Sequence, residues 1–112
     1  MQTNLFIKNK KLNTSILIKK NYIPTFVKKI AKKNEMVFCV IDSKIKNKFN
    51  FRKEKNIKII IIHCGEKIKT IDGYKYLAEK LIENNINRKS VIVAIGGGTL
   101  GDLAGFVSST VL

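Results

Sequence analysis

Three short apolar segments, each followed by polar or glycine-rich residues, constrain the fold of this chain most strongly. They span residues 36–41, 57–62 and 91–95, and Lys58 is the one charged residue within them. A segment this short and this apolar is typical of a strand buried on both faces, as in a parallel sheet. We therefore expect these three segments to be adjacent parallel strands.

Segments of helical periodicity separate and follow the expected strands. Residues 22–33, 71–84 and the stretch from 99 onward repeat apolar residues at intervals of three and four. The expected apolar stripes consist of Ile23, Phe26, Val27, Ile30 and Ala31, of Tyr74, Leu77, Ala78, Leu81 and Ile82, and of Leu100, Leu103, Ala104 and Val107. Asn21 and Thr70 are predicted N-caps, Pro24 fits a first helical turn, and Asn84-Asn85 is expected to end the second helix.

Two strand-like stretches precede the first helix. Asn4–Lys8 and Ser15–Lys19 flank a polar stretch that can turn, which predicts a hairpin. Residues 43–55 are polar and basic, which indicates a loop or a short helix. The predicted fold class is α/β: a Rossmann-like parallel sheet with flanking helices, preceded by a short N-terminal β-hairpin.

The net charge of +14 raises the question of a nucleic-acid partner. Of the 22 basic residues, all but Arg52 and Arg88 are lysines, and they are spread along the chain. Recognition of phosphates and bases favours the planar donor fork of arginine. We therefore interpret the charge as a solvated surface and expect no nucleic-acid partner.

Several other classes of protein or site are not indicated. No apolar run approaches the ~20 residues of a membrane span, and no secretory signal opens the sequence, so we expect a cytoplasmic protein without a membrane partner. Cys39 and Cys64 are expected to be free thiols, with Cys39 buried. His63 and Cys64 are adjacent on a predicted strand and point to opposite faces, so no metal site is expected there.

The candidate site lies where the three strands end. Ligands of open parallel sheets bind beyond the carboxyl ends of the strands, and these ends carry Asp42, Gly65-Glu66 and the triple glycine 96–98. Gly96, Gly98 and Gly101 match the pattern G-x-G-x-x-G between a strand and a helix, which favours a pyrophosphate site.

Structural explanations of the same residues stay open at this stage. The glycines can serve only the packing of helix against strand, Asp42 can be a simple turn residue, and Glu66 and Lys69 can form a surface ion pair. A β-carbon at Gly98 is expected to intrude on the approach of a pyrophosphate to the backbone, and Gly98 is also expected to need a backbone conformation that favours glycine.

The longer segment Ile95–Phe106 resembles the glycine-rich signature of the 3-dehydroquinate synthase family, because Gly-Asp-Leu-Ala-Gly-Phe continues the glycine motif. Gly65–Lys69 is similar to the G-E-x-x-K turn of that family, and Asn87–Ser90 also fits. The resemblance runs from about Ser15 to Leu112. Cys64 and Thr99 depart from the common pattern, which has an acidic residue and valine there.

The resemblance implies an NAD site in which Asp42 holds the adenosine ribose, the turn contacts the cofactor through Glu66 and Lys69, and Asp102, expected in the first helical turn, approaches the nicotinamide. Gly97, Gly98 and Thr99 would cradle the pyrophosphate. The cofactor-binding residues so implied are Asp42, Gly65, Glu66, Lys67, Ile68, Lys69, Gly97, Gly98, Thr99, Leu100, Gly101 and Asp102. No catalytic residue and no metal ligand is expected in this chain.

The resemblance also implies an activity. The family converts 3-deoxy-D-arabino-heptulosonate 7-phosphate to 3-dehydroquinate and phosphate in the shikimate pathway, with NAD and a divalent metal, zinc or cobalt. Members continue into a second, helical domain that holds the metal by one Glu and two His. We therefore interpret residues 1–112 as an NAD-binding domain, incomplete at its C-terminal end, of a larger two-domain enzyme. We expect the full-length enzyme to be a homodimer and this part alone to be inactive.

Two alternative functions remain. A related sugar-phosphate cyclase or a metal-dependent polyol dehydrogenase shares the layout and the triple glycine, although the Gly-Asp-Leu-Ala-Gly-Phe continuation favours the first interpretation. A basic binding module without catalysis would show clustered arginines and aromatic platforms, neither of which we find.

Overall fold

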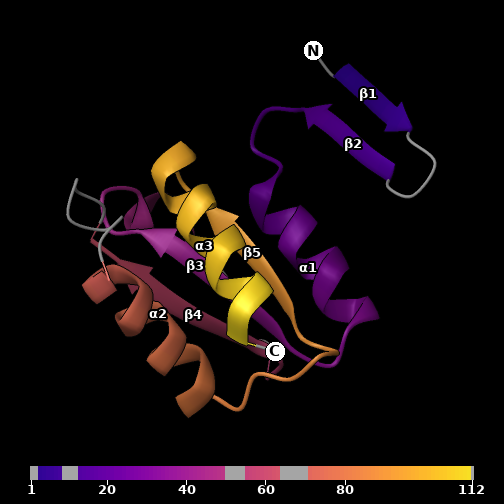
Figure 1. Cartoon of the computed structure of the whole chain (residues 1–112). Helices are drawn as coiled ribbons and strands as arrows, with labels where there is room; N and C mark the ends of the chain where they lie inside the picture. Colours follow the sequence, from indigo (N-terminus) through magenta and orange to yellow (C-terminus); the bar gives the residue numbers. More distant parts are fainter. Residues whose placement is uncertain (1–2, 9–12, 50–54, 64–70, 112) are drawn as a thin grey trace.

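A parallel three-stranded sheet lies at the centre of the fold (Figure 1). The computed structural model of the chain describes residues 3–8, 13–49, 55–63 and 71–111. The sheet consists of β3 (Val37–Asp42), β4 (Ile57–Ile62) and β5 (Val91–Ile95), in the order β4-β3-β5. Val37 lies opposite both Ile57 and Val91, and both pairings are parallel. The prediction of three adjacent parallel strands is confirmed.

Helices cover both faces of the sheet. The helix α1 (Ile23–Lys33) packs on one face, and α2 (Ile71–Glu83) and α3 (Gly98–Val111) pack on the other (Figure 1). The central strand serves both layers because successive side chains of a strand point to opposite faces. Phe38 and Val40 enter the core beneath α2 and α3, whereas Val37, Cys39 and Ile41 pack beneath α1.

Cys39 is the free cysteine that the described structure contains, and it is fully buried as the sequence predicts. Removal from water raises the pKa of its thiol to about 11. The cause is that burial disfavours the charged thiolate. Cys39 therefore packs as a small apolar side chain and is not a reactive nucleophile.

The expectation that all three strands are buried on both faces holds for β3 alone. The side chain of Ile59 in β4 is 48% exposed, and Ala94 in β5 is also exposed. The reason is position: β4 and β5 are the outer strands of the described sheet, and α1 covers the middle of its face.

The start of α1 differs from the prediction. Asn21 does not cap the helix; the N-cap is Tyr22, which makes no side-chain capping hydrogen bond. Asn21 instead adopts a positive φ of 55°. Asparagine tolerates this left-handed conformation better than most residues, so it turns the chain from the hairpin into α1. Pro24 lies in the first turn, as predicted.

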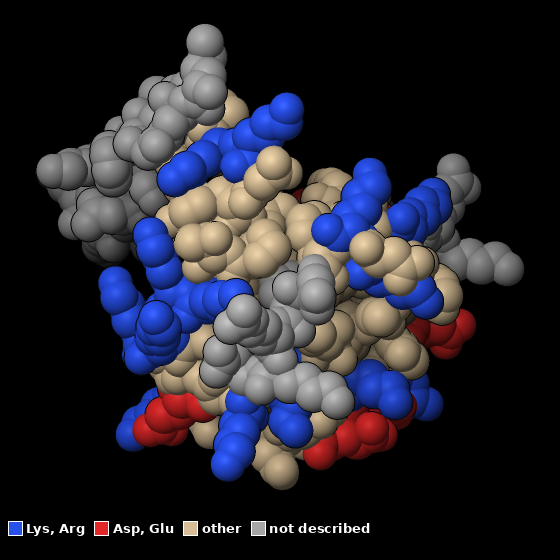
Figure 2. Space-filling view, turned by 180° about the vertical axis from the view of Figure 1, so that it is seen from behind, with Lys and Arg blue, Asp and Glu red and all other residues tan. Residues whose placement is uncertain are grey.

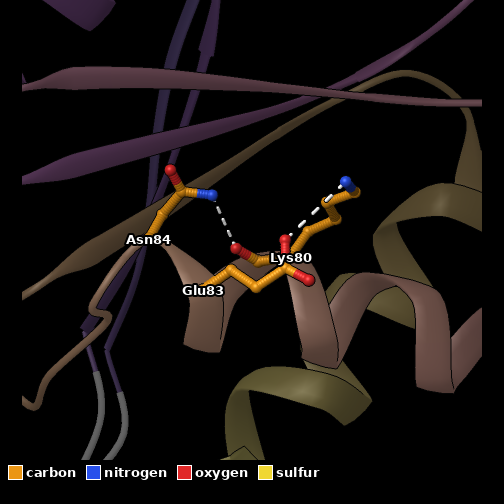
Figure 3. Close-up of polar contacts among 3 residues, drawn as sticks. All are labelled: Lys80, Glu83 and Asn84. Carbon is orange, nitrogen blue, oxygen red and sulfur yellow. Dashed lines mark hydrogen bonds and ion pairs between the residues drawn. The ribbon is translucent and has the colours of Figure 1, made fainter.

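The end of α2 is a well-formed C-cap, as the pair Asn84-Asn85 predicts (Figure 3). The side chain of Asn84 donates to the carbonyl oxygen of Lys80 at 2.7 Å, and Lys80 forms a 3.7 Å ion pair with Glu83. Asn85 has a φ of 62°, and the N–H of Ile86 donates to the carbonyl of Leu81. This left-handed termination satisfies carbonyl groups that the helix leaves unpaired.

The apolar stripes of α2 and α3 are confirmed with one exception. All four predicted stripe residues of α3 are buried. In α2, Leu77, Ala78 and Leu81 are buried, but Ile82 is 60% exposed because it lies at the border of the stripe. The predicted cap Thr70 lies outside the described residues.

The predicted hairpin is present and forms a sheet of its own. Strands β1 (Thr3–Lys8) and β2 (Asn13–Ile18) pair antiparallel, with Thr3 opposite Ile18, beside the N-terminal end of α1 (Figure 1). Within the expected loop or short helix, a single 3-10 turn, η1, spans Lys46–Lys48. Within the described ranges, no helix has the length and apolar character needed to cross a bilayer.

Candidate functional site

The topology creates a switch point at the carboxyl edge of the sheet. The chain leaves β3 toward β4 on one side, while β5 lies on the other side of β3. In open parallel sheets, ligands bind beyond the carboxyl ends of the strands where the strand order reverses, so the ends of β3 and β5 are the candidate location. Asp42 ends β3, and Gly96 directly follows β5.

Asp42 and Gly96 are neighbours at this edge of the sheet. A β-carbon added to Gly96 would lie 3.3 Å from the β-carbon of Asp42. The predicted ribose acid and the predicted phosphate loop, which are far apart in sequence, are therefore side by side.

Asp42 is held in place by a turn. Its carboxylate oxygen Oδ1 accepts a hydrogen bond from the N–H of Lys44 at 3.0 Å, and its carbonyl accepts one from Ile45 at 3.0 Å. The N–H of Ser43 also donates to the carbonyl of Ile62 in β4. Asp42 is thus a turn residue, and the same bond fixes the direction of its carboxylate. The two interpretations of Asp42 are compatible, because an ionised carboxylate has two acceptor oxygens.

Gly96 is a glycine for reasons of internal packing. Its added β-carbon would lie 2.8 Å from Cδ2 of Leu100, whose side chain is fully buried. The packing explanation of the glycine motif therefore applies to this position. It also restricts Leu100: because its side chain belongs to the core, only its backbone can contribute to a ligand site.

Internal packing does not explain the other glycines of the loop, Gly97, Gly98 and Gly101. An added β-carbon at any of them meets no atom within 4 Å, and all three residues are exposed. None of the described glycines has a positive φ, so the expectation that Gly98 needs a special backbone conformation is wrong. A glycine inside a helix costs about 0.5–1 kcal/mol relative to alanine. These glycines leave bare backbone at the surface, at the point where the helix begins.

The N-terminus of α3 is suited to an anion. The N–H of Gly101 donates to the carbonyl of Gly97 at 3.1 Å and closes the first turn. In an α-helix the N–H groups before that bond have no partner within the helix, and the helix dipole adds partial positive charge there. The backbone of Gly98, Thr99 and Leu100 therefore offers N–H donors next to the open glycine surface, as in known phosphate sites.

Asp102 lies further along the helix than predicted. The first turn of α3 contains no acidic residue, so the expected place of Asp102 in that turn is wrong. Its side chain is exposed. Because it follows Gly98 by four residues, about one helical turn, it lies on the same side of α3 as Gly98 and close to the loop.

Part of the predicted site lies outside the described residues. This applies to the turn Gly65, Glu66, Lys67, Ile68 and Lys69, and to the alternative ion pair between Glu66 and Lys69. His63 is exposed at the carboxyl end of β4. Among the residues that the structure describes, no group of three or more His, Cys, Asp or Glu side chains forms a candidate metal site.

The basic charge is distributed over the surface. Figure 2 shows Lys and Arg in separate groups across the face of the molecule opposite to that seen in Figure 1. Lys29 donates a 3.0 Å hydrogen bond to the hydroxyl of Tyr22, which lowers the pKa of that hydroxyl from its usual value, and Lys19 lies 4.6 Å from the ring centre. Lys75 and Lys89 pair with glutamates at the surface. These contacts agree with a solvated basic surface.

The sequence did not identify Gly96 as the residue at which the end of β5, the helix α3 and Asp42 meet. The glycine pattern includes Gly96 but does not separate it from the others, since only the packing of Leu100 shows which glycine the fold itself requires. Lys44 was also missed; the sequence Asp-Ser-Lys after a strand is a signal for the turn that its N–H closes.

The parallel sheet, its flanking helices and the glycine loop that follows β5 together define a Rossmann-like α/β protein. Its fold is similar to that of two solved structures of 2-deoxy-scyllo-inosose synthase. One, in complex with carbaglucose-6-phosphate, NAD⁺ and Co²⁺, gives a TM-score of 0.76 at 20% identity over 97% of this chain and 32% of that chain. The other gives a TM-score of 0.72 at 21% identity, over 96% of this chain and 33% of that chain.

The sequence defines the family more narrowly. The family model described as 3-dehydroquinate synthase N-terminal matches residues 59–112. The chain is 39% identical over 84 residues to the 3-dehydroquinate synthase of Clostridium tetani, which covers 70% of this chain and 22% of that protein. It is 37% identical over 112 residues to the 3-dehydroquinate synthase of Endomicrobium trichonymphae. This match covers 93% of this chain and 30% of that protein. The chain thus matches the 3-dehydroquinate synthase family over residues 59–112, and it spans less than a third of these relatives.

Proposed function

We propose that this chain is the NAD-binding part of a 3-dehydroquinate synthase, with residues 1–112 belonging to its N-terminal domain. The observation that carries the proposal is the set of glycines whose bare backbone surrounds the start of α3 without any internal packing reason. A ligand that approaches the backbone explains this arrangement, and a pyrophosphate also matches the N–H donors of the helix.

The residues present fit the cofactor. Asp42 would accept hydrogen bonds from the adenosine ribose, with its carboxylate directed by the N–H of Lys44. The N–H groups of Gly98, Thr99 and Leu100 would bind the pyrophosphate, and Gly97 and Gly101 would leave room for it. Glu66 and Lys69, in the turn Gly65–Lys69, would complete the site from the end of β4. Asp102 would lie toward the nicotinamide.

In the whole protein, the proposed reaction converts 3-deoxy-D-arabino-heptulosonate 7-phosphate to 3-dehydroquinate and phosphate. When bound, the nicotinamide ring would supply reversible acceptance of a hydride from the substrate carbon that carries a hydroxyl group, and the protein would contribute position and electrostatics. A divalent metal, zinc or cobalt, belongs to the proposal for the whole protein. Its expected ligands are one Glu and two His, whereas this chain has a single His. The 112-residue chain alone is therefore not expected to release phosphate. We place the whole enzyme in the cytoplasm as a homodimer.

Another sugar-phosphate cyclase is the second candidate, favoured by the solved structures with this fold. The sequence weighs against it, because identity to those structures is 20–21% while identity to the dehydroquinate synthases cited above is 37–39%. Activity on the two sugar phosphates separates the candidates. A polyol dehydrogenase would instead transfer hydride to free NAD⁺ without release of phosphate.

The proposal is tested in a chain extended past Leu112 with the remaining sequence of the Clostridium tetani relative, called the extended chain below. Gly98→Val should weaken NAD⁺ binding by at least about 10-fold, because the new side chain fills the open space beside the first N–H groups. The control is Lys32→Ala on the exposed surface of α1, which should leave the affinity unchanged. A calorimetric NAD⁺ titration, with folding checked by thermal melt, gives the answer. A folded Gly98→Val variant that binds like the parent would remove the loop from the site.

A further inference from the structure

The acidic residues of this chain are unevenly distributed. All eight follow residue 34, whereas residues 1–34 contain lysines and no Asp or Glu. Elsewhere in the structure, Lys75, Lys80 and Lys89 each form an ion pair with a glutamate. The lysines of α1 form no ion pair with any other described residue. The positive charge of α1 is therefore not neutralised within the described part of the chain.

One side of α1 brings aromatic and basic side chains to the surface. Val27 and Ala31 are buried beneath the helix. The residues at i, i+4, i+7 and i+11 from Tyr22 lie on the other side, because these intervals return to the same side of an α-helix. The end of β2 and the residue after it lie beside the start of this side. We define the α1 patch as Ile18, Lys19, Tyr22, Phe26, Lys29 and Lys33.

Contacts within the α1 patch arrange its groups around Tyr22. Lys29 donates a 3.0 Å hydrogen bond to the Tyr22 hydroxyl, and Nζ of Lys19 lies 4.6 Å from the centre of the Tyr22 ring. The rings of Tyr22 and Phe26 are 6.3 Å apart, centre to centre. Ile18 is 59% exposed and Phe26 is 40% exposed. Because an aromatic ring carries no net charge, the two ammonium groups beside it keep their full charge for a partner.

The composition of the α1 patch favours an acidic protein surface as its partner. Exposed apolar side chains that gather in one place mark sites of protein interaction, and opposite charges across an interface determine which partner is accepted. A second copy of this chain would present the same patch, and a symmetric contact would bring like charges together. Nucleic acid is disfavoured because the patch has lysines and no arginine. A bilayer is disfavoured because Phe26 packs against Tyr22 instead of projecting outward.

We propose that the α1 patch is a docking surface for an acidic segment of another protein, one that combines Asp or Glu with aromatic or aliphatic side chains. Its carboxylates would pair with the lysines of the patch, and its apolar side chains would cover Ile18 and Phe26. The patch is separate from the N-terminus of α3, because α1 and α3 pack on opposite faces of the sheet. This inference does not depend on the proposed activity.

Calorimetric titration of the extended chain tests the proposal with two synthetic peptides of equal negative charge. One peptide combines glutamates with phenylalanines, and in the other peptide serines replace the phenylalanines. The first should bind with a Kd on the order of 10–100 μM, and the second should bind at least about 10-fold more weakly. Equal affinities, or no binding of either peptide, would overturn the proposal. Tighter binding of phosphatidylserine vesicles or of oligothymidylate would assign the patch to a membrane or to nucleic acid and would also overturn it.

Three variants of the extended chain locate the binding on the patch. Lys29→Glu and Lys58→Glu change the net charge equally, but Lys58 is exposed on β4, on the face of the sheet opposite to α1. Lys29→Glu should weaken binding of the phenylalanine peptide by at least about 10-fold, and Lys58→Glu by less than about 2-fold. Phe26→Ser should weaken binding of the phenylalanine peptide at unchanged net charge. Thermal melts check that each variant is folded. Equal effects of Lys29→Glu and Lys58→Glu in folded proteins would contradict the proposal.

Discussion

The side chain of Leu100 occupies the space beside Gly96, where a β-carbon on Gly96 would lie only 2.8 Å from Cδ2 of Leu100. Leu100 is fully buried and cannot move aside without disturbing the core beneath α3. Gly96→Ala should therefore destabilise the fold by about 1–3 kcal/mol, as overpacking does. Denaturant unfolding measures this loss. Gly97→Ala, with open space at its β-carbon, is the control and should change stability by less than ~0.5 kcal/mol.

Gly101 and Gly105 allow function to be separated from stability. Both lie on the exposed side of α3 with open space around them, and Gly105 is one turn further from the N-terminus. Replacement by alanine should stabilise the helix by about 0.5–1 kcal/mol at each position. In the extended chain, Gly101→Ala should nevertheless weaken NAD⁺ binding, whereas Gly105→Ala should not. Equal NAD⁺ affinities for the two variants, measured by titration, would count against a cofactor role of Gly101.

Asp42→Asn tests the carboxylate without removing its structural hydrogen bond. The amide oxygen of asparagine can still accept the N–H of Lys44, so the melting temperature should stay close to that of the parent. Loss of the charge should weaken NAD⁺ binding in the extended chain by roughly 10-fold, since hydrogen bonds to charged groups contribute about 1.5–3 kcal/mol. Asp42→Ala should lose stability as well. Unchanged affinity in both variants would reduce Asp42 to a turn residue.

Cys39 should give the fold a specific sensitivity to alkali. Its pKa is raised from 9.0 in the unfolded reference to about 11 in the folded chain. The unfolded thiol therefore loses its proton first, so the stability that Cys39 contributes is complete below pH 9 and is lost as the pH rises to about 11. In a Cys64→Ser background, melting temperatures across this range should fall more steeply than those of a Cys39→Val variant. Parallel curves for the two proteins would show that the thiol does not titrate with unfolding.

The parts of the fold that depend on the polarity of individual side chains along the sequence were predictable. Alternating apolar strands and amphipathic helices gave the parallel sheet, and the stripe of α3 matched all its buried residues. Burial of β4 and β5 was predicted too strongly, because an apolar run shows that a strand can be covered but not where it lies in the sheet. Asn21 was misassigned because the same residue type suits both an N-cap and a left-handed turn.

The candidate site was predictable in composition but not in geometry. The strand-end rule brought Asp42 and the glycine loop to one edge, and the structure makes Asp42 and Gly96 neighbours. The sequence does not distinguish a glycine required by packing from one that leaves bare backbone, since this depends on where the side chain of Leu100 points. Asp102 was expected in the first turn of a helix that starts at residue 99, but α3 starts at Gly98, so Asp102 falls just beyond that turn.

The position of β3 between its two partners has a consequence for the order of folding. β4 follows β3 closely along the chain, whereas β5 joins only after the whole of α2 has been traversed. Closing the longer loop costs more chain entropy, and contacts of large sequence separation form slowly. We therefore expect β5 to dock after β4. Since Gly96 meets Asp42 only when β5 is in place, the candidate site at the carboxyl edge would be among the last features to form, and the proposed cofactor would bind only to chains that have completed this step.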